Sequence, residues 1–176
     1  MELTNIPIEQ LMLRPISVWA PNWLLLTSGD FAAGDYNTMT VAWGSLGMMW
    51  NLPFAQVVVR PVRYTYEFME KYDTFTLTGF PGKYRKALKL LGSTSGRDGD
   101  KIAVAGLTPT AASQVAAPSF AEAKLLIECR KMYWQDVDPA HFLDKRLAKQ
   151  YPQADYHRIY YGEIIAVSGA PKFLAE

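Results

Sequence analysis

The chain has 176 residues, of which 49% are hydrophobic and 13% aromatic, and its 18 basic and 17 acidic side chains give a net charge of +1 at pH 7. This apolar content excludes intrinsic disorder, and surface scaling predicts that folding buries about 70% of the unfolded surface, enough for a core without disulfides. The near-neutral charge argues against a nucleic-acid-binding protein, so we expect one domain over residues 1–176 with no nucleic-acid partner.

The first part of the chain is predicted to form a β-meander. It contains the apolar runs WLLLTSGD, TMTVAWGSLGMMW and AQVVVR, which are separated by Gly, Asp and Asn. Runs of this length between turn residues are typical of antiparallel hairpins or of a barrel. Pro61 closes the third run, and Met48, Met49 and Trp50 are expected to pack inside the protein.

Two helices and a strand are predicted next. Thr65 is a candidate cap for a helix that runs to about Tyr72. TFTLTGF alternates with period two, as a half-buried strand does, and PGKYRKALKLLG has the spacing of a helix that ends at Gly92.

The second half adds two long strands around an insertion. GSTSGRDGDK reads as an ordered loop, EAKLLIECRKMYW and HRIYYGEIIAVSG as strands, and PAHFLDKRLAKQY between them as a short amphipathic helix. No run of βαβ units is present. The predicted fold class is therefore α+β, with a mainly antiparallel β core built as a barrel and a few inserted helices.

Several kinds of site are excluded by missing motifs. The chain has no GxGxxG, GxxxxGK[ST], HExxH, CxxC or GxSxG, and its only Cys is Cys129, which we expect to be a buried apolar residue without a redox role. With only two histidines, no histidine-rich metal site is expected. The N-terminus lacks the pattern of a signal peptide, so we expect a cytoplasmic protein with no membrane partner.

Three motifs remain as candidates for a binding site. RPVRYT (60–65) places two arginines and a hydroxyl at a predicted helix start, which suits a phosphate, although arginines that pair with Glu67, Glu70 or solvent are the commoner explanation of such a pattern. SGRDGDK (95–101) offers backbone amides and a lysine, or is a solvated turn. NTMTVAW (37–43) offers polar donors beside an aromatic ring, or a turn and a core residue. The segment 60–101 holds nine basic and five acidic side chains, a local charge of +4.

Taken together and in this order, NTMTVAW, RPVRYT, SGRDGDK and the late YYGEI resemble the flavin reductase-like family of FMN-binding split-barrel proteins, which includes the flavoredoxins. The resemblance covers nearly the whole chain. It implies that FMN, with FAD as an alternative, is held by residues of these motifs. By position they are Asn37, Met39, Thr40, Trp43, Thr65, Ser95 and Lys101, with Arg60 and Arg63 near the phosphate.

The resemblance also implies a histidine and a C-terminal aromatic side chain near the flavin. Phe173 is the aromatic candidate, and His141 and His157 are the alternatives for a histidine that positions a nicotinamide or delivers a proton. It implies a homodimer with flavin near the interface and an oxidoreductase that takes hydride from NADH or NADPH and passes electrons to a small molecule or a protein. The alternative is a flavoredoxin-type electron carrier that does not oxidise NAD(P)H directly.

Overall fold

The computed structural model describes residues 3–173 and 175, and its centre is an eight-stranded sheet in which every pairing is antiparallel. The strand order is β3-β2-β6-β9-β10-β5-β4, with β1 added to β10, and β7 and β8 form a separate pair. The strands are β1 Thr4–Asn5, β2 Leu24–Asp30, β3 Asp35–Val41, β4 Gly44–Met49, β5 Leu52–Val59, β6 Thr74–Gly79, β7 Pro109–Thr110, β8 Ser119–Phe120, β9 Leu125–Asp136 and β10 Arg158–Gly169. This sheet confirms the predicted antiparallel core.

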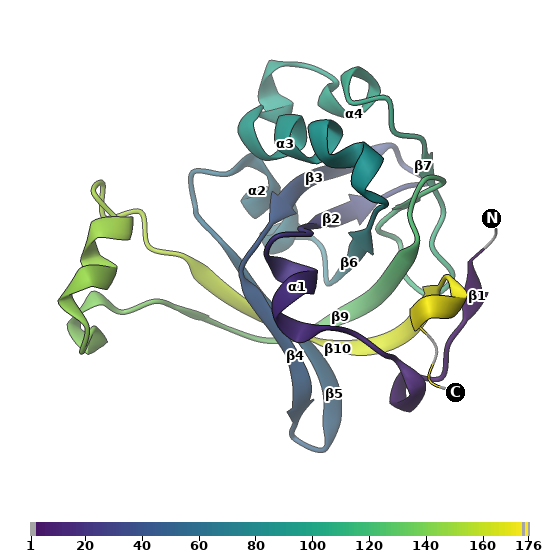
Figure 1. Cartoon of the computed structure of the whole chain (residues 1–176). Helices are drawn as coiled ribbons and strands as arrows, with labels where there is room; N and C mark the ends of the chain where they lie inside the picture. The colour runs from purple at the N-terminus through teal and green to yellow at the C-terminus, as the bar shows by residue number, and fades with distance from the viewer. Residues whose placement is uncertain (1–2, 174, 176) are drawn as a thin grey trace.

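Four short α-helices accompany the sheet. They are α1 Pro15–Trp19, α2 Tyr64–Lys71, α3 Arg85–Ser93 and α4 Lys101–Val104. Single 3-10 turns cover Ile8–Gln10, Gly82–Tyr84, Gly96–Asp98, Pro139–His141 and Pro171–Phe173, and a longer one covers Lys145–Gln150. Figure 1 shows α3 and α4 gathered over the end of the sheet that contains β2 and β3. No helix of the described residues is long and apolar enough to cross a membrane.

The two faces of β2 are buried in two different clusters. Leu24 and Leu26 point into the main core, while Leu25, between them, packs with Leu88 and Leu91 of α3. Side chains alternate along a strand, so a strand covered on both faces has no solvent side. The same holds for β6, whose four central residues are all buried. The prediction of a half-buried strand there is wrong because residues 118–120 lie against its second face, where Thr76 Oγ1 donates a hydrogen bond to the Pro118 carbonyl.

The helix boundaries differ from the prediction in two places. α2 begins at Tyr64, with Arg63 at the N-cap position, and Thr65 lies inside the helix with its hydroxyl turned to β3. α3 continues through Gly92 to Ser93. Thr65 is therefore not a capping residue, and Gly92 does not end its helix.

The segment 137–157, between β9 and β10, projects from the body of the protein (Figure 1). It contains 3-10 turns where one amphipathic α-helix was predicted, and Leu143 is 99% exposed. The predicted apolar face has no sheet beneath it within the chain, because β9 is exposed from Arg130 onward. We call residues 137–157 the projecting segment.

The hairpin between β4 and β5 is exposed at its tip. Met48 and Trp50 lie mostly in solvent, and the Trp50 ring makes edge contacts with Tyr133 and Tyr161. The expectation that Met48, Met49 and Trp50 are core residues is therefore wrong. The tip instead forms part of an exposed aromatic surface.

Candidate functional site

The NTMTVAW and RPVRYT motifs meet where β3 lies beside α2. Asn37 of β3 and Thr65 of α2 are both buried, and the Asn37 Nδ2 donates a 2.8 Å hydrogen bond to Thr65 Oγ1. A buried amide needs partners, and this bond uses one of its two donors. The pair fixes the start of α2 against the sheet, 28 residues apart in sequence.

Two cationic side chains lie in the same cavity as Thr65. They are Arg63 and Lys101, which line a space of about 120 Å³ together with Thr65 and Ser95. We call it the cation cavity. The carbonyl groups at the C-terminal end of α3 hold both cations: Lys101 Nζ donates to the Leu91 and Thr94 oxygens at 3.2 and 3.0 Å, and Arg63 donates to the Gly92 oxygen. Free carbonyls at a helix C-terminus favour positive charge, which explains why the cations gather there.

The charge of these two groups is not neutralised by carboxylates. Lys101 is only 5% exposed, and burial, with the neighbouring Arg63, lowers its pKa to about 8. Burial and the charge of Arg60 lower the pKa of Arg63 as well. No ion pair of the described residues involves either group. A buried cation such as Lys101, with the half-buried Arg63 beside it and no counter-ion, is costly, so the cavity suits an anion.

Glu67 and Glu70, the two carboxylates that could have paired with the arginines of RPVRYT, bind other side chains. Glu67 pairs with Arg97, and Glu70 binds Arg158 at 2.8 Å and the hydroxyl of Tyr160. Neither neutralises Arg60 or Arg63. Neither arginine is therefore held by these two carboxylates; among the described residues Arg63 forms no ion pair, whereas Arg60 pairs with Asp155.

The glycine-rich motif lies directly against Asn37. A Cβ added at Gly96 would come within 2.4 Å of Asn37 Oδ1 and 3.0 Å of the Tyr64 ring, so only glycine fits. The Ser95 hydroxyl accepts from the Arg97 amide, and Asp100 caps α4 by accepting from Ile102 and Ala103. The loop is thus an ordered wall of the site, as the sequence predicted, and it separates the cation cavity from a second space of about 300 Å³ beside Tyr36 and Tyr64.

A third space, of about 160 Å³, lies where β3 ends. Met39, Thr40, Trp43, Arg60 and His157 line it. We call it the tryptophan cavity. Trp43 is 47% exposed, and its ring centroid lies 5.3 Å from that of His157. A half-exposed indole offers a flat apolar surface, which is suitable for packing against a planar ligand.

His157 is a buried member of this group. Its side chain is 9% exposed, and its Nδ1 lies 2.8 Å from the hydroxyl of Tyr151. Burial, helped by the positive charge of Arg60 and opposed by Asp155, lowers the pKa of His157 to about 4. The imidazole is therefore neutral at physiological pH.

Arg60 faces the projecting segment. Its Nη1 donates to both carboxylate oxygens of Asp155 at 2.8 and 3.1 Å, and its Nη2 donates to the Gln150 carbonyl at 2.7 Å. Its guanidinium also lies 5.1 Å from the Tyr151 ring centroid. Arg60 lines the tryptophan cavity, whereas Arg63, three residues later, lines the cation cavity.

Two of the candidates lie apart from the rest. The His141 side chain is 83% exposed in the projecting segment, beside Asp138. Phe173 packs at the far end of β10, against Gly169, and lines a different cavity. Cys129 is fully buried in the core, where burial raises the pKa of its thiol. The structure therefore groups His157, and neither His141 nor Phe173, with the three motifs.

Tyr151, Asp155 and Tyr64 belong to the site but were not among the candidates. Tyr151 and Asp155 occur in a stretch whose sequence indicates only a surface insertion. Their part depends on Arg60, which lies outside the projecting segment, and on His157, which is the last residue of that segment. No group of three His, Cys, Asp or Glu side chains in the described residues is arranged to hold a metal ion.

Comparisons with known proteins identify the family and the fold of the chain. A family model described as "Flavin reductase like domain" matches residues 20–174. No curated protein matches the chain in sequence. An FMN-binding domain of a flavin reductases-like enzyme from Shewanella baltica has a TM-score of 0.69 at 16% identity, with 96% of this chain and 77% of that one covered.

Two further solved structures have similar scores. Flavoredoxin of Desulfovibrio vulgaris (Miyazaki F) has a TM-score of 0.66 at 22% identity, covering 92% of this chain and 73% of that one. The NADH:FAD oxidoreductase of Streptomyces globisporus C-1027 has a TM-score of 0.65 at 16% identity, covering 86% and 76%. At these identities the likeness shows a shared split-barrel fold.

Proposed function

The chain belongs to the flavin reductase-like domain family, and on this basis we propose that it is an FMN-binding oxidoreductase that accepts hydride from NADH or NADPH. The observation that carries the proposal is the pair of cations, the buried Lys101 and the half-buried Arg63, in a cavity that also presents the hydroxyl-bearing residues Thr65 and Ser95. A phosphate dianion is complementary to two cations and two hydroxyls.

The residues fit the separate parts of FMN. Arg63, Thr65, Ser95 and Lys101 would hold the phosphate, and Asn37 retains one amide donor and its oxygen for a polar partner. Trp43 and Met39, with the tryptophan cavity, would take the apolar ring. When bound, FMN supplies hydride and electron transfer, so the protein needs to bind and orient more than to provide an acid or a nucleophile.

His157 contributes a neutral imidazole to this arrangement. Because its pKa lies well below neutrality, it would act as a hydrogen-bond donor toward a ring or an amide and not as a proton source at pH 7. The proposed role of His157 is therefore to position a ring or an amide, and not to transfer a proton. His141, exposed in the projecting segment, is proposed for no step.

A flavoredoxin-type electron carrier is the second candidate. Arg60 holds the projecting segment at the rim of the tryptophan cavity, which supports a site that is too restricted for a nicotinamide. In this case FMN stays bound and exchanges electrons with a protein partner.

The experiment begins with the colour of the purified protein and its reconstitution with FMN. Anaerobic stopped-flow mixing with NADH or NADPH then separates the two candidates, since hydride transfer bleaches the visible absorption of bound flavin. Bleaching at a rate that saturates with nucleotide supports the reductase. If dithionite bleaches the flavin but neither nucleotide does, the carrier is correct, and failure to bind FMN or FAD contradicts both.

We also propose a homodimer formed through the exposed aromatic surface of the β4–β5 hairpin and β9. Trp50 and Tyr133 are about half exposed there, their rings make an edge contact, and clustered aromatic side chains are typical of interfaces. Sedimentation of the protein and of the Trp50→Ser variant tests it. The proposal requires a dimer that the substitution weakens.

A further inference from the structure

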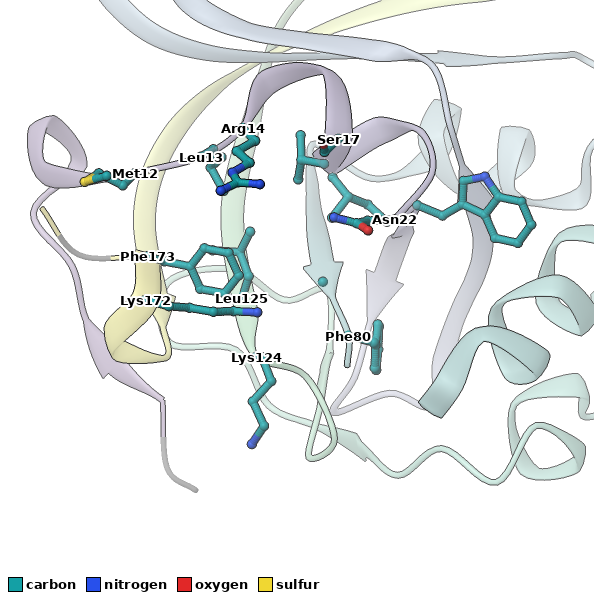
Figure 2. A pocket seen from close by; sticks show the side chains of 14 residues that line it. Met12, Leu13, Arg14, Ser17, Asn22, Phe80, Lys124, Leu125, Lys172 and Phe173 are labelled. Atoms are coloured by element: carbon teal, nitrogen blue, oxygen red, sulfur yellow. The ribbon is translucent and has the colours of Figure 1, made fainter. Parts of the chain in front are cut away.

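A larger cavity lies away from the candidate flavin site, at the end of the sheet that α1 covers. It has a volume of about 470 Å³, within the range usual for small-molecule sites, and shares no lining residue with the other three cavities. Its walls come from α1, the start of β2, the end of β6, the start of β9 and the 3-10 turn Pro171–Phe173. We call it the α1 cavity (Figure 2).

The inner surface of this cavity is apolar. Val18, Leu24 and Leu125 form buried parts of the wall, and the aromatic rings of Phe80 and Phe173 add partly exposed apolar surface. Figure 2 shows Phe80 on one side of the space and Phe173 on the other. A ligand that packs against these side chains is therefore expected to have an apolar body.

The mouth of the cavity is positively charged. Arg14 and Lys172 are exposed lining residues and, among the described residues, neither forms an ion pair. In Figure 2 both lie on the side of Phe173, with the Lys172 ammonium directed toward the open space. No acidic residue is among the described residues that line the cavity. Such a mouth attracts an anionic group and repels a cationic one.

Backbone hydrogen bonds keep the walls together without a ligand. The Met12 amide donates to the Phe173 carbonyl at 2.8 Å, and the Ala170 amide donates to the Lys124 carbonyl at 2.9 Å. These bonds connect the N-terminal segment, β9 and the end of β10 around the cavity. A preformed site loses less entropy on binding than one that must first become ordered.

We propose that the α1 cavity binds a small amphipathic carboxylate, with its apolar body inside the cavity and its carboxylate at the mouth, where Arg14 and Lys172 supply positive charge. The ligand class follows from the apolar interior and the two unpaired cations at the mouth. Ser17 and Asn22 line the same cavity and offer a hydroxyl and an amide as further donors. This site does not depend on flavin binding.

Octanoate is a suitable probe, and calorimetric titration of the whole protein tests the site. Octanoate is expected to bind with one-to-one stoichiometry, and 1-octanol and octylamine about tenfold more weakly or not at all, because they lack the carboxylate. In NMR spectra, the Asn22 side-chain amide and the Gly79 backbone amide are expected to shift during the titration. No binding of octanoate, equal binding of 1-octanol, or shifts located elsewhere would each overturn the proposal.

A double variant separates the two cations from general charge effects. Arg14→Gln with Lys172→Gln is expected to weaken octanoate binding about tenfold or more. Lys145→Gln with Lys149→Gln removes the same charge from exposed positions of the projecting segment and is expected to change nothing. Because all four residues are exposed, both variants should fold, which thermal unfolding checks. Unchanged affinity in the first variant, or equal losses in both, would contradict the site.

Discussion

The hydroxyl of Tyr151 lies 2.8 Å from Nδ1 of His157, and it connects two residues of the projecting segment, of which His157 is the last before β10. A neutral imidazole has one donor and one acceptor nitrogen. Burial raises the pKa of Tyr151, so the hydroxyl stays protonated, and no other acceptor is found for it in the part of the chain that the structure describes. We therefore expect Tyr151 to donate to Nδ1, an arrangement in which the imidazole proton lies on Nε2.

The Tyr151→Phe substitution is expected to remove the preference of His157 for the Nε2–H tautomer. Without the hydroxyl, Nδ1 of His157 has no donor, so the Nε2–H form loses its advantage and the pKa of His157 rises from about 4 toward its ordinary value. Nitrogen-15 NMR of the imidazole measures both changes. Tyr156→Phe is the matched control, because Tyr156 contacts Tyr151 through its ring only. Identical spectra for the wild type and Tyr151→Phe would contradict the assignment.

The low pKa of His157 predicts a pH dependence of stability. The unfolded imidazole binds a proton below about pH 6.5, whereas the folded one does so only near pH 4. The neutral form thus contributes fully above pH 6.5, and its contribution is lost as pH falls through this window. The loss approaches about 3 kcal/mol, since one pKa unit corresponds to about 1.4 kcal/mol. His157→Gln should flatten the fall in the free energy of unfolding between pH 6.5 and 4; an unchanged slope contradicts the prediction.

The strands were predictable because local pattern determines them. WLLLTSGD, AQVVVR and HRIYYGEIIAVSG carry the period-two or continuous apolar character that a sheet requires, and they became β2, β5 and β10. PAHFLDKRLAKQY has helical spacing but no sheet beneath it, so tertiary contacts with Arg60 decide its form. Helices this short are marginal without a packing surface.

The sequence predicts the three motifs of the candidate site, but it does not predict which of their residues contact which other residues. The sequence shows that RPVRYT carries two arginines, but not that Arg60 faces Asp155, 95 residues later, while Arg63 faces the end of α3. Periodicity cannot separate them, because their roles depend on long-range contacts. For the same reason the sequence left His141 and His157 as alternatives, and only burial distinguishes them.

Arg60 and Arg63 are expected to respond differently to substitution. Arg60→Gln removes the bonds to Asp155 and Gln150, so the projecting segment should open and trypsin should cut at Lys145, Arg146 or Lys149 several-fold faster. Arg63→Gln should leave cleavage unchanged and weaken FMN binding more than Arg60→Gln does. The opposite pattern would place the phosphate at Arg60.

Lys101 is expected to act on the phosphate of FMN. Lys101→Met should lower the affinity for FMN about tenfold or more, because a charge-assisted contact is lost, and should leave riboflavin binding nearly unchanged. Riboflavin lacks the phosphate and so reports whether the rest of the site is intact. Lys89→Met, an exposed residue of the same region, is the control for charge. Equal losses of affinity for FMN and for riboflavin would indicate that Lys101 contacts the flavin ring and not the phosphate. In that case the substitution should change the midpoint potential of bound flavin.

The pKa of Lys101 predicts how FMN affinity depends on pH. In the free protein, burial and Arg63 hold that pKa at about 8. A bound phosphate dianion favours the charged ammonium, so it raises the pKa, and binding above pH 8 requires uptake of a proton. Affinity should therefore be constant just below pH 8 and fall about tenfold per unit above it, until the raised pKa is reached. Below about pH 6 the phosphate itself gains a proton.

Fluorescence titrations from pH 6 to pH 10 measure this profile of FMN affinity. Lys101→Arg, whose side chain stays charged, should remove the fall above pH 8, and riboflavin should show none. A fall that persists in Lys101→Arg would assign the titration to another group and separate Lys101 from the phosphate.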